Sequence, residues 1–178
     1  MLKKILLDST EFHFSDSHLP ALIHGKENEG SSLFTISMLA DLHSQGLNVV
    51  ALTGFAMASD ELYKQIGEEG KDRVAVFVKE QTREFLDFIQ KQNDTHKRVV
   101  LVQNIELFEK EVLDAVRDFE KLVIAGDISK CSYKESLLSI NFATKIYFSK
   151  LDQSLPPLQQ YEGYLSSTNT KGTISVEV

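Results

Sequence analysis

The sequence predicts an α/β fold in a single domain over residues 1–178, with a mostly parallel sheet and a C-terminal antiparallel hairpin. Two observations support this prediction. Apolar runs of five to seven residues alternate with segments of helical period, which is typical of strands that are buried on both faces and joined by helices. The 178 residues, 42% of them hydrophobic and 25% charged, are enough for one sizeable core but too few for two ordinary domains.

The elements follow from local patterns. Strands are predicted where short apolar runs rich in Val, Ile, Leu and Phe occur, and helices where apolar residues recur three and four positions apart. Gly46 ends the first predicted helix and Ser59 is the expected N-cap of the second. In chain order the predictions are strand 20–24, helix 31–45, strand 48–53, helix 59–66, strand 73–78, helix 81–92, strand 97–102, helix 109–119, strand 121–125 and strand 143–148.

The pattern changes after Pro156 and Pro157, which interrupt the alternation of strands and helices. Residues 161–167 and 173–178 flank a turn-rich stretch, 168–172, and are predicted to pair as the terminal hairpin.

Composition limits the class of protein. The net charge of −7 argues against autonomous nucleic-acid binding, which needs a basic surface or a partner that supplies one. The single cysteine, Cys131, excludes an internal disulfide and fits a reducing compartment. The first residues do not fit a signal peptide, and no apolar run approaches the roughly 18 residues of a membrane span. We therefore expect a cytoplasmic protein, or one shared between cytoplasm and nucleus, without membrane attachment.

The loop after the first predicted strand reads Gly25-Lys-Glu-Asn-Glu-Gly30-Ser-Ser32 and precedes a predicted helix. It has the glycine spacing of the phosphate loop G-x-x-x-x-G-K-[ST], but Ser31 stands in place of the essential lysine. Such a loop binds phosphate through backbone N–H groups, a helix N-terminus and the lysine charge, whereas Glu27 and Glu29 add negative charge here. The sequence thus predicts a RecA-like P-loop three-layer sandwich with a degenerate phosphate loop. Its weak cofactor-binding candidates are Gly25, Lys26, Gly30, Ser31 and Ser32, with Ser32 read as a helix N-cap.

Two further catalytic positions of P-loop ATPases are replaced. The fourth predicted strand leads into Gln103, where an aspartate would hold Mg²⁺ through water, and Glu106 is read as a surface or helix-start carboxylate. Phe55, after the second strand, cannot act as the base that activates water. Asp127, after the fifth strand, is interpreted as a turn or cap residue. The sequence therefore predicts a pseudo-ATPase with no catalytic residues.

No other constellation points to chemistry. The histidines lack the spacing of metal ligands, so we interpret them as surface or hydrogen-bonded side chains and predict no metal site. Cys131 is read as a small core or loop residue. The histidines are His13, His18, His24, His43 and His96.

With its ATPase signature lost, the chain resembles a recombinase-type P-loop protein, and within that group it is similar to the sixth-subunit family of the Elongator complex. The resemblance rests on residues 21–33, 99–108 and 122–127, together with the closing stretch from 155–158 to 173–176, and spans most of residues 20–178. It implies a ring of RecA-like subunits, shared with the fourth and fifth subunits, that binds tRNA and supports modification of wobble uridines. No catalytic residue is carried over.

The predicted function is a non-catalytic subunit of such a hetero-oligomeric ring, with other RecA-like subunits as partners and tRNA bound through the assembly. Lys130, Lys134 and Lys171 are the RNA-contact candidates, and a solvated surface is the alternative reading for each.

Two other functions were weighed. An active P-loop ATPase or nucleotide switch would use Lys26 as a substitute lysine and Glu106 or Asp127 for magnesium, so that a weak ATP and Mg²⁺ site would persist. A P-loop small-molecule kinase is disfavoured, because the phosphate lysine and an arginine-rich lid are both missing.

Overall fold

The computed structural model describes residues 3–26, 29–91, 96–149 and 161–177. Within these ranges the chain forms one ten-stranded sheet. The strands are β1 (Ile5–Leu7), β2 (Thr10–Phe12), β3 (Ala21–His24), β4 (Asn48–Thr53), β5 (Val74–Val78), β6 (Arg98–Gln103), β7 (Leu122–Gly126), β8 (Thr144–Tyr147), β9 (Gly163–Ser167) and β10 (Lys171–Val176). The α-helices are α1 (Ser31–Ser44), α2 (Ala56–Ile66), α3 (Thr82–Lys91), α4 (Lys110–Val116) and α5 (Lys134–Leu138).

The strand order is β2-β1-β10-β9-β8-β3-β7-β6-β4-β5. The six strands from β8 to β5 run parallel, and the four strands on the other side are added in antiparallel pairs. Because consecutive parallel strands need a crossover connection, the helices between them pass over the faces of the sheet.

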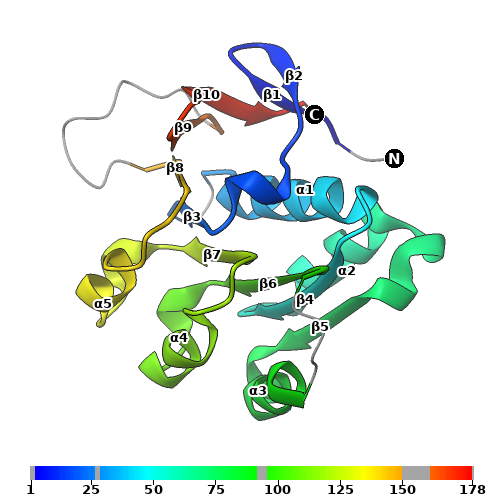
Figure 1. The fold of residues 1–178 in the computed structure, drawn as a ribbon, viewed down its shortest axis with the longest axis vertical. Coiled ribbons are helices and arrows are strands. Elements are labelled where there is room, and N and C mark those ends of the chain that lie inside the picture. The colour runs from blue at the N-terminus through cyan, green and yellow to red at the C-terminus, as the bar shows by residue number, and fades with distance from the viewer. Residues whose placement is uncertain (1–2, 27–28, 92–95, 150–160, 178) are drawn as a thin grey trace.

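Helices cover both faces of the parallel strands, giving three layers. Figure 1 shows α1 and α2 on one face and α3, α4 and α5 on the other. Successive residues of one strand divide between the two cores, since Ala21 and Ile23 pack with α1 whereas Leu22 packs on the opposite face. The predicted α/β three-layer sandwich with a mostly parallel sheet is thus confirmed.

Helix α1 is the most buried of the helices, with ten of its 14 residues buried. It contacts the parallel strands, α2 and also β1 and β10 of the antiparallel extension, so its sides as well as its sheet-facing surface are covered. Two of its buried hydroxyl groups are satisfied inside the helix: Thr35 donates to the Ser31 carbonyl at 2.7 Å, and Ser37 to the Leu33 carbonyl at 2.9 Å.

The predicted terminal hairpin is confirmed, because β9 and β10 pair antiparallel with Gly172 opposite Leu165. Its second strand begins at Lys171, inside the stretch expected to be the turn. The Pro156-Pro157 break lies outside the described residues. The sequence analysis missed the pairing of β1 with β10 and with β2, which places the N-terminal segment beside the C-terminal strand (Figure 1).

The second helix differs from the prediction. It begins at Ala56 rather than Ser59, so Ser59 lies within the helix and does not cap it. Phe55 occupies the N-cap position, and its side chain cannot accept the hydrogen bond that a serine would. Helix α5 was also missed, because it has only five residues and a single buried side chain, Leu137.

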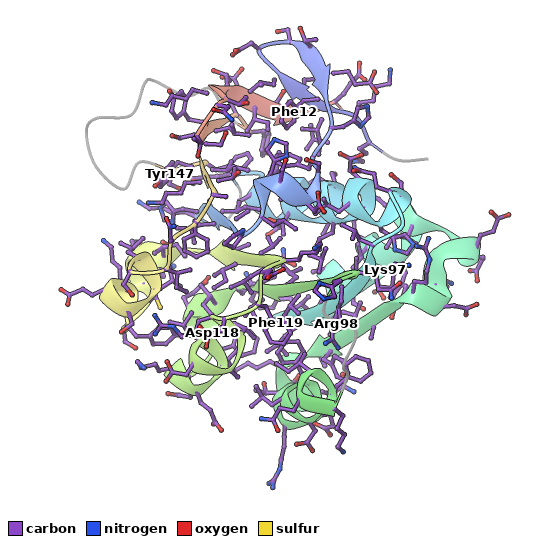
Figure 2. All side chains as sticks on the ribbon, in the orientation of Figure 1. Phe12, Lys97, Arg98, Asp118, Phe119 and Tyr147 are labelled. Carbon is purple, nitrogen blue, oxygen red and sulfur yellow. The ribbon has the colours of Figure 1, made fainter. Side chains whose placement is uncertain are left out.

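A buried arginine lies under the sheet, at the start of β6. The Arg98 side chain is 2% exposed, and its guanidinium lies over the Phe119 ring at 5.8 Å from the centroid. Figure 2 shows the two labelled side chains next to each other, on the side that carries α3 and α4. This stacking fixes the segment after α4 against the sheet at the edge opposite the loop of residues 25–30.

Candidate functional site: a cleft at the carboxyl edge of the parallel strands

Strands β3, β7, β6 and β4 are neighbours and run in the same direction, so their carboxyl ends meet at one edge of the sheet. A cleft of about 580 Å³ opens there. It is lined by residues that follow each of these strands, and by Tyr161 from the segment before β9. The lining brings together all five predicted loop residues, Gly25, Lys26, Gly30, Ser31 and Ser32, with Phe55, Gln103, Glu106, Asp127 and Lys130.

One carboxylate of the loop lies against the loop backbone. Glu29 Oε2 accepts a hydrogen bond from the Lys26 N–H at 2.9 Å and another from the Ser149 hydroxyl. The Lys26 N–H also lies 3.0 Å from Ser149 Oγ. Ser149 is buried and follows β8, so a residue 120 positions away in the sequence holds the Glu29 carboxylate in place. Glu27, the other predicted acidic residue of the loop, lies outside the described residues.

The remaining described amides at the start of this loop have partners inside the protein. The Gly25 N–H donates to the Gly126 carbonyl at 3.1 Å, and the Glu29 N–H approaches the Lys26 carbonyl at 3.4 Å. Three backbone donors, those of Gly25, Lys26 and Glu29, are therefore already engaged.

The two glycines of the loop are required for different reasons. A Cβ atom at Gly25 would lie 2.3 Å from Ser31 Cβ, so the loop passes too close to the start of α1 for any side chain. Gly30 has φ +89° and precedes α1 as its N-cap, with Tyr161 packed against it. Ser32 is exposed and is the second residue of α1, which corrects its prediction as the N-cap.

Acidic side chains gather on the other side of the cleft. Glu106 Oε2 accepts from the Asp127 N–H at 3.1 Å, and Asp127 Oδ1 accepts from the Ser129 N–H at 3.2 Å. Lys130 Nζ lies 3.7 Å from Asp127 Oδ2. The interpretation of Asp127 as a cap residue is confirmed. The interpretation of Glu106 as a surface or helix-start carboxylate is wrong, because it is half-buried, lines the cleft and bonds the chain after β7.

These two carboxyl groups differ in their pKa. Burial raises the pKa of Glu106 above its ordinary value. Burial acts in the same direction on Asp127, but the hydrogen bonds from Ser129 and the nearby His24 and Lys130 outweigh it, and the pKa of Asp127 is lowered. Asp127 therefore carries the more stable negative charge of the pair.

His24, the last residue of β3, is fully buried beneath the cleft. Its Nδ1 accepts a hydrogen bond from the Ile128 N–H at 3.0 Å, which fixes the neutral ring with its proton on Nε2. Burial lowers the pKa of His24, and the nearby Asp127 opposes this shift only in part. The prediction of a surface or hydrogen-bonded histidine is met at Nδ1, whereas Nε2 has no hydrogen-bond partner among the described residues.

The replaced catalytic positions both line the cleft. Gln103 ends β6 and is 2% exposed, and its Oε1 has no hydrogen-bond partner in the described part of the chain. Phe55 follows β4 with 60% of its surface exposed. An amide and a phenyl ring supply neither a strong metal ligand nor a base at these positions.

The three lysines proposed for RNA contact are not gathered on one surface. Lys130 lies at the cleft, and Lys134 follows it as the first residue of α5 rather than in a loop. Lys171 pairs with Ser166 at the tip of the β9–β10 hairpin. Because β9 runs antiparallel to β8, this tip lies beside the start of β8, at the edge of the sheet opposite the cleft.

Three residues of this site were missed by the sequence analysis: Ser149, Tyr161 and His24 as a buried cleft residue. His24 ends a predicted strand next to the loop, and that position was the available signal for it. Ser149 and Tyr161 reach the loop from distant segments, and no local pattern points to them.

No family model and no curated protein matches the chain by sequence. Solved structures do match in fold. The pCW3 conjugation coupling protein TcpA, solved with ATPγS, superposes with a TM-score of 0.59 at 10% identity over 97% of this chain; the chain spans 65% of the TcpA chain. The genome packaging NTPase B204 from Sulfolobus turreted icosahedral virus 2, in complex with AMPPCP, gives a TM-score of 0.57 at 11% identity over 89% of this chain and 95% of its own.

A third solved structure is the flagellar accessory protein FlaH from Methanocaldococcus jannaschii, with a TM-score of 0.54 at 11% identity over 89% of this chain and 88% of its own. Identities this low establish the fold alone. No helix within the described ranges is long and apolar enough to cross a membrane. The sheet order, the loop between β3 and α1 and these similarities together show that the chain has the fold of RecA-like P-loop NTPases.

Proposed function

We propose that this chain is a non-catalytic RecA-like subunit of a hetero-oligomeric assembly. The observation that supports the proposal most directly is the place of Glu29. Its carboxylate accepts the Lys26 N–H within the loop whose backbone donors would otherwise face a phosphate. The protein thus satisfies part of its anion site with its own side chain.

A nucleotide would have to displace this internal anion. It would then meet Ser31 where a lysine charge is needed, and losing one charge-assisted hydrogen bond costs roughly 1.5 to 3 kcal/mol, about ten- to a hundredfold in affinity. Glu29 would add electrostatic repulsion wherever it moved within the loop. Nucleotide binding is therefore weakened at the step before any chemistry.

Hydrolysis lacks its usual groups as well. Gln103 replaces the carboxylate that orients Mg²⁺ and Phe55 replaces the base, and each of these groups contributes orders of magnitude to rate. Glu106 does not substitute as a metal ligand in the arrangement described, because it is half-buried and bonded to the Asp127 N–H.

The resemblance to the sixth-subunit family makes an Elongator-type ring of RecA-like subunits the first assembly to test, with tRNA bound through the ring. The separation of Lys171 from Lys130 supports contact through the assembled ring rather than through a basic patch on this chain alone. The net charge of −7 favours the same arrangement.

Isothermal titration of ATP and Mg²⁺ tests the loss of nucleotide binding. We expect no saturable heat from the purified chain, and the same result for Lys26→Ala and for the control Lys64→Ala, an exposed lysine on α2. Binding at low micromolar Kd that disappears only in Lys26→Ala would reject the proposal and support the alternative, an active ATPase or switch that uses Lys26.

Assembly is tested separately. Size-exclusion chromatography with light scattering would measure the mass of the chain alone and after mixing with the fourth and fifth Elongator subunits. A stable complex with those subunits is expected. A monomer that none of them binds would remove the assembly from the proposal.

A further inference from the structure

The part of the cleft away from the phosphate loop is suited to a cation rather than to an anion. Its carboxylates are Glu106 and Asp127, and its cation, Lys130, already lies 3.7 Å from Asp127. Lys26 stands at the loop and is exposed. The N-terminus of α1 would favour an anion, but Glu29 supplies one within the loop that leads into it.

Two buried acceptors in this part of the cleft have no hydrogen-bond donor among the residues that the structure describes. They are Gln103 Oε1, on a side chain that is 2% exposed, and Asp127 Oδ2, on a side chain that is 4% exposed. Both residues line the cleft. Buried acceptors are nearly always satisfied in folded proteins, and a missing donor costs about 1 to 3 kcal/mol. The unsatisfied oxygens therefore point to a ligand that donates hydrogen bonds.

The rim of the cleft indicates what carries these donors. The exposed large hydrophobic side chains of the described residues are Phe55 at 60%, Met57 at 82% and Tyr161 at 56%. Phe55 and Tyr161 line the cleft, and Met57 follows Phe55 by two residues. An apolar rim around a buried polar pocket is typical of a protein-binding surface, in which a central anchor is surrounded by groups that exclude water.

We propose that this cleft binds an arginine side chain of a partner protein. A guanidinium has five N–H donors in one plane and no acceptor, so it can serve Asp127 Oδ2 and Gln103 Oε1 together while its charge meets Glu106 and Asp127. A lysine ammonium is a point charge with a larger hydration cost and cannot span separated acceptors as well. The phenyl and phenol rings of Phe55 and Tyr161 would contact the stem and neighbouring residues of the partner.

This inference rests on the proposed absence of nucleotide from the cleft, and it names the chemistry of the partner. It is tested on the full chain, labelled with ¹⁵N, by titration with N-acetyl-arginine N-methylamide. The matched compound is N-acetyl-lysine N-methylamide. Saturable shifts of the amide signals of Gly126, Asp127 and Ser129 are expected with the arginine compound, with affinity about tenfold higher than for the lysine compound.

Three variants locate the binding. Asp127→Asn keeps an acceptor for the Ser129 N–H but removes the charge, and it should weaken the arginine compound by about tenfold or more. Gln103→Leu removes the second acceptor at similar volume and should also weaken it. Glu135→Gln, which changes the net charge equally at an exposed position on α5, should leave affinity unchanged.

The inference is overturned if the arginine compound gives no saturable shifts, if the lysine compound binds equally well, or if Asp127→Asn and Glu135→Gln behave alike. A parallel titration with ATP and Mg²⁺ separates this inference from the proposed function. Saturable ATP shifts at Lys26 and Ser31 would reject the non-catalytic proposal whatever the arginine result, whereas failure of both ligands would reject the arginine site alone.

Discussion

The contact between Gly25 and Ser31 leads to a sharp prediction about the degenerate loop. In Gly25→Ala the new Cβ would lie 2.3 Å from Ser31 Cβ and 2.4 Å from Ser31 Oγ, well inside van der Waals contact. Ser31 is the first residue of α1, and its carbonyl accepts from Thr35, so its backbone cannot move without disturbing the buried helix. Overpacking of this kind costs about 1 to 3 kcal/mol of the free energy of unfolding.

The cost should depend on the Ser31 side chain. In a Ser31→Gly background both clashing atoms are gone, and the nearest remaining atom would be Phe148 Cβ at 3.2 Å. Gly25→Ala should then cost less than about 1 kcal/mol, which gives a coupling energy of about 1 kcal/mol or more between the two positions. The matched background is Ser32→Gly, since Ser32 is the exposed neighbour, and there the two effects should add.

Urea denaturation followed by circular dichroism measures all six proteins: the starting sequence, Gly25→Ala, the two serine variants and the two double variants. We expect changes in the midpoint with a constant slope, which indicates a change in stability alone. An equal cost of Gly25→Ala in the Ser31→Gly and Ser32→Gly backgrounds would refute the close approach, and with it the account of why the loop needs glycine at this position.

Three further predictions concern the site and its surroundings. The double variant Glu29→Gly and Ser31→Lys removes the internal anion and restores the phosphate-loop motif, so titration calorimetry should detect ATP binding that the unmodified chain lacks; no gain would show that other groups block the cleft. Burial lowers the pKa of His24 and, with Arg73 assisting, of His43, so the unfolded chain binds more protons below about pH 6.5. The free energy of unfolding should therefore fall between about pH 7.5 and 5.5, and replacing both histidines with glutamine should flatten this urea-midpoint profile. Tyr133→Phe removes a hydroxyl that donates to two backbone carbonyls at 2.8 and 3.0 Å, and it should lower the free energy of unfolding by about 1 to 2 kcal/mol in the same assay; an unchanged midpoint would contradict the role of these bonds.

Local sequence was sufficient for the parallel core of the fold. Residues 48–53 were predicted as a strand and form β4 with the same bounds, because an apolar run buried on both faces has few alternatives. The terminal hairpin was predicted for a similar reason, since its turn-rich stretch separates two strand-forming segments. The short helix α5 and the pairing of β1 with β10 were not predictable, because their stability comes from contacts with distant parts of the chain.

The candidate site divides in the same way. The sequence alone determined which chemical groups are missing, because Ser31, Gln103 and Phe55 can be read against the spacing of a phosphate loop and the ends of predicted strands. Only the tertiary structure decided what fills the space. The contact of Ser149 with Glu29 and the bond from the Ile128 N–H to His24 join residues more than a hundred positions apart. Such contacts depend on strand order and on the packing of side chains at one edge of the sheet, and local periodicity carries no information about either.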